Sequence, residues 1–177
     1  MTVSQYWAYY KVKSHSVVQE AQRELGEVLP EFYEKEDNYH LTVHPQFQFD
    51  ESEHDRFEHY LHKNFPSEIN IHADSFYYHP EKDKPLVICF SATPNIPFQK
   101  AQQNLVNDIE NNGGKSVISP VPPHITIYAD KDRNTTASAR RIPSNVNQIK
   151  TKCEKLEEKL LPVTFKSNKL HFETVNR

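Results

Sequence analysis

In two short segments of the 177-residue sequence, a histidine and a threonine stand two positions apart and alternate with aliphatic residues. They are residues 40–43, His-Leu-Thr-Val, and residues 124–127, His-Ile-Thr-Ile. Alternate residues of a β-strand project from the same face. Each segment is therefore predicted to be a half-buried strand that buries its aliphatic face and presents an imidazole beside a hydroxyl on the other.

Two imidazoles and two hydroxyls are the groups that cleavage of a phosphodiester requires. One of His40 and His124 can take a proton from the attacking oxygen while the other gives a proton to the leaving oxygen, and the sequence does not assign the two roles. An ordinary histidine pKa near ~6.5 allows one neutral and one charged imidazole near neutral pH. Thr42 and Thr126 can donate to the non-bridging phosphate oxygens. This chemistry needs no metal or other cofactor, so we expect none. The competing explanation is two half-buried strands that happen to carry polar exposed faces.

Apolar periodicity predicts the elements that must position these groups. Strands are expected over residues 5–12, 39–43, 69–74, 86–90 and 121–128, with Pro45 closing the second of them, and a strand pair or one bulged strand over 163–175. Helices are expected over residues 17–29, 50–65, 98–109 and 144–160. Short, aromatic, half-exposed strands alternate with these helices, which favours an α+β fold with antiparallel sheets.

Composition restricts the remaining possibilities. A length of 177 residues suits one domain or two lobes that share a core. The net charge of −3 gives no sign of a surface that grips long nucleic acid. Cys89 and Cys153 fall on apolar stretches and are expected to be buried thiols. Neither a signal peptide nor a membrane-spanning segment is visible, so we expect a cytoplasmic protein with no membrane contact.

The two triplets, in this setting, resemble those of the two-histidine (2H) phosphoesterase superfamily, and within it the LigT-like group of 2′-5′ RNA ligases and RNA 2′,3′-cyclic phosphodiesterases. The resemblance covers nearly the whole chain. It includes the segments 38–43 (Asn-Tyr-His-Leu-Thr-Val), 85–90 (Pro-Leu-Val-Ile-Cys-Phe) and 122–127 (Pro-Pro-His-Ile-Thr-Ile), in the order the family has them.

The resemblance implies one bilobal domain over residues 1–177, with two antiparallel sheets related by pseudo-twofold symmetry around a central cleft and helices on the outside. It implies that His40 and His124 are catalytic and that Thr42 and Thr126 bind phosphate. The implied reaction opens an RNA or nucleotide 2′,3′-cyclic phosphate to a 2′-phosphate. The implied partner is a nucleotide or an RNA end, and no obligate protein partner is inferred.

Several further residues are candidates for contact with a substrate. Tyr39 and Tyr128 flank the triplets, and His44 projects with His40 and Thr42 if the strand continues. Members of the LigT-like group often carry an arginine shortly after the second triplet, where this chain has residues 128–130, Tyr-Ala-Asp. The missing positive charge could come from the loop that follows, which contains Arg133, Arg140 and Arg141.

Two other functions stay open at this point. The same machinery could act on 2′-5′ oligoadenylates or cyclic oligonucleotide signals, or the chain could bind a nucleotide or an RNA end without turnover.

Overall fold

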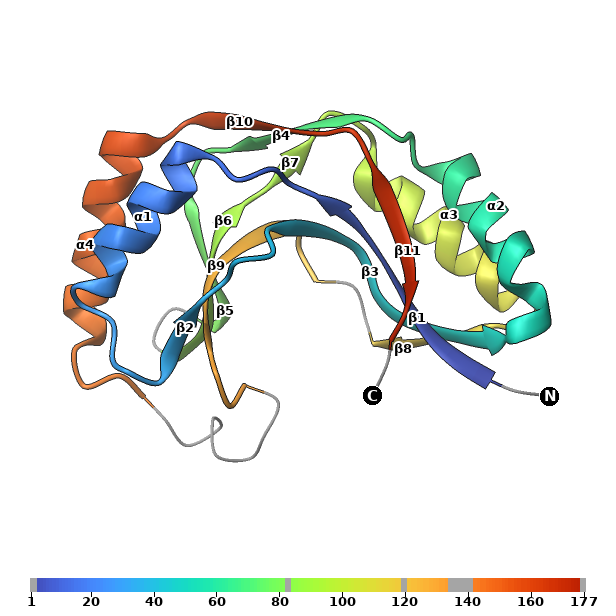
Figure 1. The fold of residues 1–177 in the computed structure, drawn as a ribbon, viewed down its shortest axis with the longest axis horizontal. Helices are drawn as coiled ribbons and strands as arrows, with labels where there is room; N and C mark the ends of the chain where they lie inside the picture. The colour runs from blue at the N-terminus through green and yellow to red at the C-terminus, as the bar shows by residue number, and fades with distance from the viewer. Residues whose placement is uncertain (1–2, 82–83, 119–120, 134–141, 176–177) are drawn as a thin grey trace.

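The structure is a computed structural model that describes residues 3–81, 84–118, 121–133 and 142–175. A curled antiparallel sheet of eight strands forms its centre, and a second sheet of three strands lies along one edge (Figure 1). Helices α1 and α4 cover one end of the large sheet, and helices α2 and α3 cover the other end (Figure 1). This arrangement confirms the predicted α+β, bilobal architecture with helices on the outside.

The helices that the structure describes are α1 (Ser16–Gly26), α2 (His54–Asn64), α3 (Phe98–Glu110) and α4 (Val146–Leu160), with a 3₁₀ turn at Glu51–Glu53 before α2. The large sheet has the order β11 (Leu170–Thr174), β1 (Val3–Lys11), β3 (His40–Asp50), β9 (His124–Asp130), β6 (Lys84–Ser91) and β5 (Phe76–Glu81). Strand β2 (Tyr33–Lys35) pairs with β9, and β8 (Lys115–Ile118) pairs with β3. The small sheet has the order β10 (Val163–Ser167), β4 (Ile69–Ala73) and β7 (Thr93–Pro94).

The large sheet is pseudo-symmetric about its two central strands. Strands β3 and β9 pair through Leu41 and Ile125, the middle residues of the two triplets. Outward from this pair, β1 lies beside β3 as β6 lies beside β9, and β11 lies beside β1 as β5 lies beside β6. The same pseudo-symmetry relates the two short strands, since β8 pairs with β3 and β2 pairs with β9.

Both central strands carry a β-bulge just after their threonine. Tyr9 of β1 pairs with Thr42 and the preceding Ala8 pairs with His44, so the residue between, Val43, is the extra one. In β9, Thr126 pairs with Cys89 of β6 and Tyr128 pairs with the preceding Ile88, so Ile127 is the extra residue. A bulged residue is left out of the ladder, and its buried carbonyl needs another donor.

A buried glutamine from a helix supplies that donor in each lobe. Gln102 of α3 donates from Nε2 to the carbonyl oxygen of Val43 at 2.7 Å. Gln22 of α1 donates from Nε2 to the carbonyl oxygen of Ile127 at 3.2 Å. The triplet strands are thereby tied to the helices that pack on their buried face.

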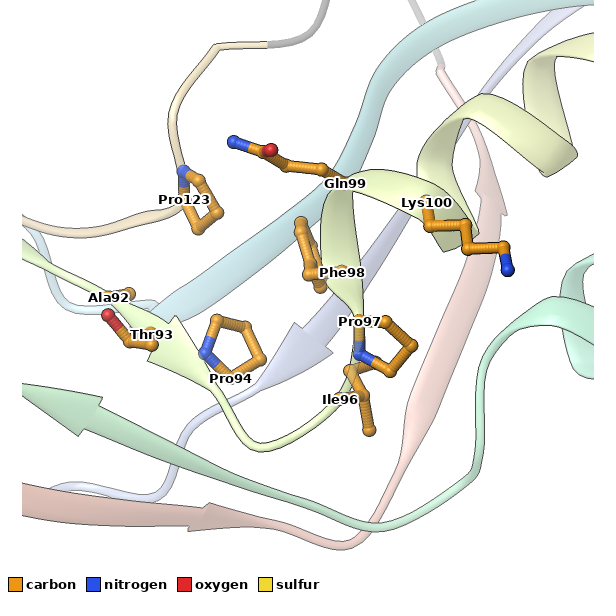
Figure 2. Close-up of a pocket in the computed structure, with 9 residues that line it drawn as sticks. All are labelled: Ala92, Thr93, Pro94, Ile96, Pro97, Phe98, Gln99, Lys100 and Pro123. Atoms are coloured by element: carbon orange, nitrogen blue, oxygen red, sulfur yellow. The ribbon is translucent and has the colours of Figure 1, made fainter.

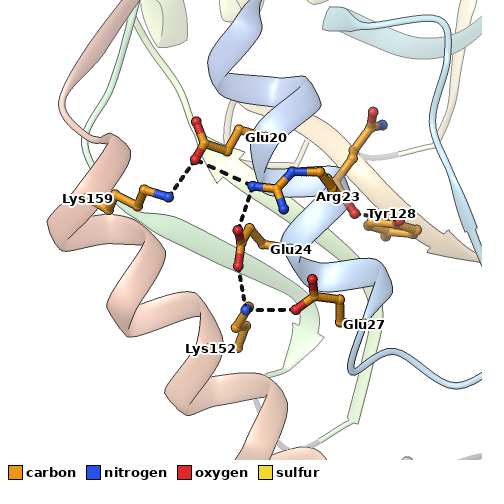
Figure 3. A network of polar contacts seen from close by, with 8 residues as sticks. Glu20, Arg23, Glu24, Glu27, Tyr128, Lys152 and Lys159 are labelled. Carbon is orange, nitrogen blue, oxygen red and sulfur yellow. Dashed lines mark hydrogen bonds and ion pairs between the residues drawn. The ribbon is translucent and has the colours of Figure 1, made fainter.

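The outer helices follow the predicted apolar stripes. Helix α1 buries Val18, Ala21 and Leu25, and helix α4 buries Ile149, Cys153 and Leu156. An ion-pair network joins the exposed sides of these two helices (Figure 3). Its members are Lys159 with Glu20, Arg23 with Glu20 and Glu24, and Lys152 with Glu24 and Glu27. The exposed pairs of this network contribute little individually, whereas the pair of Lys152 with Glu24 is partly buried.

Two predictions about the elements were wrong. Pro45 does not close the first triplet strand, since β3 continues to Asp50 through two irregularities that keep its apolar residues Phe47 and Phe49 on the buried side. The second helix does not begin at Asp50, because the polar residues that follow form a 3₁₀ turn and α2 starts at His54.

Replacing Gln22 by leucine tests the proposed structural role of this residue. The variant removes the partner that Gln22 provides to the hydroxyl of Tyr39 and to the carbonyl oxygen of Glu36. It also removes one of two donors to the carbonyl of Ile127, which keeps the backbone N–H of Glu36. Each buried polar group left unpaired costs roughly 1–3 kcal/mol, so we expect the free energy of unfolding to fall by about 2–4 kcal/mol. Urea denaturation measures this change. Gln19→Leu, on the exposed side of the same helix, should change it little, and equal effects of the two substitutions would contradict the assigned role.

Candidate active site

The two triplets meet on the inner face of the large sheet. Leu41 and Ile125 are fully buried on the helix side, so His40, Thr42, His124 and Thr126 project from the opposite side. Because β3 and β9 run antiparallel about the Leu41–Ile125 pair, His40 lies toward Thr126 and Thr42 lies toward His124. The two histidines therefore lie on one diagonal of a four-residue cluster.

Each histidine is oriented by the same backbone contact. Nδ1 of His40 lies 2.7 Å from the carbonyl oxygen of Asn38, and Nδ1 of His124 lies 2.8 Å from that of Pro122. A carbonyl oxygen only accepts, so Nδ1 carries the proton in both rings. In the neutral form Nε2 is then the acceptor, and this is the atom available for proton transfer on the inner face.

The two threonines have different neighbours across the sheet. Sγ of Cys89 on β6 lies 3.8 Å from Oγ1 of Thr126. Burial raises the pKa of the Cys89 thiol to about 12, so the thiol stays protonated and inert as a nucleophile. At the equivalent position, Thr42 pairs with Tyr9 of β1.

Electrostatics separates the two histidines. Burial is the largest cause that lowers the pKa of His124, and the nearby imidazoles of His79 and His40 lower it further. The hydrogen bond to the Pro122 carbonyl acts in the opposite direction. The balance favours the neutral ring, which is the form that can accept a proton.

Aromatic and ionisable side chains extend the site on both sides. Trp7 and Tyr9 of β1 meet the ring of His40 edge-on, with centroid distances of 5.1 Å and 5.6 Å. Tyr77 of β5 lies 5.8 Å from the ring of His124, and His79 follows on the same strand. Tyr77 and His79 are not among the candidates that the sequence suggests. The alternation of side chains along β1 and β5 could have identified the residues beside the triplets only if the order of the strands in the sheet had been known.

Comparison with known proteins points to one fold. No family model matches the sequence, and no curated protein matches it. Among solved structures, Usb1 of Kluyveromyces marxianus aligns over 96% of this chain and 93% of its own, with a TM-score of 0.60 and 12% identity. Escherichia coli LigT aligns over 99% of this chain and 96% of its own, with a TM-score of 0.55 and 10% identity. The ns2 PDE domain of MHV aligns over 98% of this chain and 99% of its own, with a TM-score of 0.54 and 9% identity.

The chain has the LigT-like 2H phosphoesterase fold. The resemblance stated from the sequence is therefore confirmed at the level of the fold. The two triplets lie on the two central strands of that fold.

The tyrosines beside the triplets lie on the opposite side of the 2H sheet from the histidines. The hydroxyl of Tyr39 donates to Oε1 of Gln22 at 2.8 Å, and the hydroxyl of Tyr128 donates to the carbonyl oxygen of Gln22 at 2.8 Å. Both side chains are buried, and Figure 3 shows Tyr128 directed at helix α1. The prediction that they contact substrate is not supported. Strand alternation directs Tyr39 away from the inner face, and the bulge at Ile127 reverses the alternation so that Tyr128 also points into the core.

His44 is also in the core. The bulge at Val43 reverses the alternation, so His44 does not project with His40 and Thr42 and is fully buried. Its Nε2 lies 2.9 Å from Oγ of Ser116, and its ring packs edge-on against Phe47. Burial lowers its pKa to about 4. The predicted contact with substrate is therefore wrong, for a reason that single-strand periodicity does not reveal.

The predicted arginines do not join the cluster. Arg133 is exposed in the turn after β9, at the end of that strand farthest from His124. Arg140 and Arg141 lie outside the described residues. Among described cations, Lys11 comes nearest to the triplets, since it pairs across the sheet with His40.

Two other features lie apart from the triplets. On α2, potential metal-ligand atoms of His54, Asp55 and Glu58 lie within 4.8 Å of one another. Asp55 is exposed, and exposed acidic groups commonly lie this close together without an ion. No helix of the described residues has the length and apolar character needed to cross a membrane.

A pocket of about 480 Å³ borders the site at Pro123, the residue before His124 (Figure 2). The start of helix α3 and the segment 92–94 form its other walls. Gln99 extends toward Pro123, whereas Lys100 points the other way (Figure 2). Lys100 is the ionisable residue in this lining.

The buried His44 predicts an acid-sensitive contribution to stability. Its pKa is about 4 in the folded protein against an ordinary value of 6.5, so between these values the unfolded chain binds a proton that the folded protein does not. The free energy of unfolding should therefore fall as the pH falls from 6.5 to about 4, by up to roughly 3 kcal/mol.

Urea denaturation between pH 7 and pH 4 tests this prediction. His44→Gln should flatten the dependence of stability on pH, whereas His59→Gln, on the exposed side of α2, should leave it as in the wild type. An unchanged pH slope in His44→Gln would show that this imidazole is not kept neutral by the fold.

Proposed function

We propose that this chain is a metal-independent phosphodiesterase that hydrolyses an RNA or nucleotide 2′,3′-cyclic phosphate to a 2′-phosphate. The observation that carries the proposal is the diagonal arrangement of His40 and His124, with Thr42 and Thr126 completing the cluster on one face. Two imidazoles with Nε2 available, on opposite sides of one position, suit an in-line displacement at phosphorus.

In the proposed reaction, Nε2 of one histidine takes a proton from water as its oxygen bonds to phosphorus. The bond between phosphorus and the 3′ oxygen breaks, and the other histidine gives that oxygen its proton. The lowered pKa of His124 favours this residue as the base and leaves His40 as the acid. The hydroxyls of Thr42 and Thr126 donate to the non-bridging oxygens, where negative charge increases in the transition state.

The thiol of Cys89 supports the role of Thr126. A protonated thiol can donate to Oγ1 of Thr126. The hydroxyl hydrogen of Thr126 is then left for the phosphate. Lys11 adds a positive charge on the strand beside His40.

The similar structures include Usb1 with uridine monophosphate and LigT with 3′-AMP. Those ligands belong to those proteins, but they show that this fold can hold a nucleotide. They support a nucleotide or an RNA end as the substrate class for this chain.

Turnover of a nucleoside 2′,3′-cyclic phosphate in the presence of EDTA tests the proposal. The wild type should release the 2′-phosphate, and chromatography of the products identifies it. His124→Ala removes one of the two proton-transfer groups and should lower kcat/KM by about 10²- to 10⁴-fold.

His59→Ala, an exposed histidine of α2, is the matched control and should retain the wild-type rate. Loss of activity in EDTA that is restored by a divalent ion would contradict the metal-independent scheme. If only 2′-5′-linked oligoadenylates or cyclic oligonucleotides are cleaved, the proposed acid–base mechanism stands and the proposed substrate is wrong. Tight binding of nucleotides without turnover would instead indicate a binding protein.

A further inference from the structure

The site has two side walls, one formed by β1 and β11 beside His40 and the other formed by β6 and β5 beside His124. The pseudo-symmetry relates the strands of the two walls, but their side chains differ. Tyr9 pairs with Thr42 on one side and with His171 on the other, and Cys89 pairs in the same way with Thr126 and Tyr77. One step along the same face, Trp7 pairs with Glu173 where Val87 pairs with His79. At this step the wall beside His40 therefore has Trp7, which stacks on Tyr9, and the carboxylate of Glu173, where the wall beside His124 has Val87 and His79.

The aromatic part of the His40 wall is preorganised. The rings of Trp7 and Tyr9 stack with centroids 4.1 Å apart, and the rings of Tyr9 and His171 stack at 4.9 Å with an interplanar angle of 7°. Tyr9 is almost fully buried, whereas Trp7 is half-buried. Trp7 thus presents aromatic surface on the inner face, held in place by the ring beneath it.

The carboxylate of Glu173 stands across the sheet from Trp7. Its Oε1 accepts from the hydroxyl of Tyr9 at 2.8 Å and lies 3.5 Å from Nδ1 of His171. Burial and the neighbouring carboxylate raise the pKa of Tyr9 to about 12, so this hydroxyl remains a donor. The Glu173 side chain is 49% exposed, and among the described residues its contacts use Oε1, so Oε2 is available to a ligand.

We propose that Trp7 and Glu173 form a nucleobase subsite that selects bases with an exocyclic amino group. The base stacks on Trp7, as unpaired bases do on aromatic side chains, and its amino group donates to Oε2 of Glu173. Thr42 and Glu173 lie two strands apart and two residues out of register, roughly 12 Å between their backbones, a span that the sugar and base of one nucleotide and the two side chains can bridge. This inference rests on the proposed function, since it takes the phosphate to lie at the triplets.

The subsite also fixes the direction of the substrate. With the base on the His40 wall, the phosphodiester enters the pseudo-symmetric cluster in one orientation. The wall beside His124 has Val87 and His79 at the positions of Trp7 and Glu173, so it has no aromatic platform equivalent to Trp7 and no carboxylate at the position of Glu173. The two histidines then keep distinct roles in every turnover.

A matched pair of substrates tests the subsite: adenosine 2′,3′-cyclic phosphate and purine riboside 2′,3′-cyclic phosphate, which lacks only the amino group. The wild type should prefer adenosine in kcat/KM by about 10-fold or more, as expected for a hydrogen bond to a charged group. Glu173→Ala should bring that ratio close to one. Trp7→Ala should raise KM for both substrates by about 10-fold. Glu34→Ala, an exposed carboxylate on β2, is the control and should retain the wild-type ratio.

Equal rates on the two substrates, or a preference that survives Glu173→Ala, would overturn the subsite and leave the proposed function standing. If neither substrate is cleaved, the proposed function fails and the subsite is tested by calorimetry with 2′-AMP and purine riboside 2′-phosphate. A 10-fold tighter binding of 2′-AMP that is lost in Glu173→Ala would support the subsite. Equal binding of the two nucleotides, or no binding of either, would overturn it.

Discussion

The hydrogen bonds from Gln102 to Val43 and from Gln22 to Ile127 are the constraint on which the site depends. Each bulge shifts its strand just after the His-x-Thr triplet, and at each bulge a helix glutamine donates to the carbonyl of the extra residue. The carbonyl of Ile127 also accepts from the backbone N–H of Glu36 at 2.9 Å. The glutamines tie the helices to the strands at the two bulges. The histidines and threonines project from the other side of the same short segments, so their relative positions follow from these two bonds.

Pseudo-symmetry built in this way gives a site with two equivalent halves, and the side walls then make the halves different. The histidines keep the same backbone partner two residues before them, at Asn38 and Pro122. Burial and neighbouring imidazoles lower the pKa of His124, and the aromatic and acidic residues of the flanking strands distinguish the His40 side. A symmetric frame therefore holds the two histidines, and under the proposed function their asymmetric neighbours give them different roles.

Sequence patterns predicted the architecture because the local signals agreed with the tertiary structure. The apolar stripes of the four helices and the alternation at residues 40–43 and 124–127 match the buried residues observed. The third helix, expected over residues 98–109, ends at Glu110 shortly before Gly113, whose positive φ of 85° suits a helix end. Cys89 and Cys153 are buried free thiols, as expected.

What the sequence could not reveal depends on pairing between distant strands. The bulge at Val43 arises from the register with β1 and moves His44 from the inner face into the core. Trp7, Tyr77 and Glu173 reach the site only because β1, β5 and β11 are its neighbours in the sheet. The periodicity of apolar residues along the sequence does not reveal the order of the strands in the sheet.

The most direct test of the central claim, that His40 and His124 act as one acid–base unit, is a double-mutant cycle on phosphodiester turnover. The rates of His40→Ala, His124→Ala and the double variant should all be nearly equal, because residues that act together lose their effect together. If the losses instead multiply, so that the double variant is slower than either single variant by the full factor of the other, the two histidines act independently and the proposed mechanism is wrong.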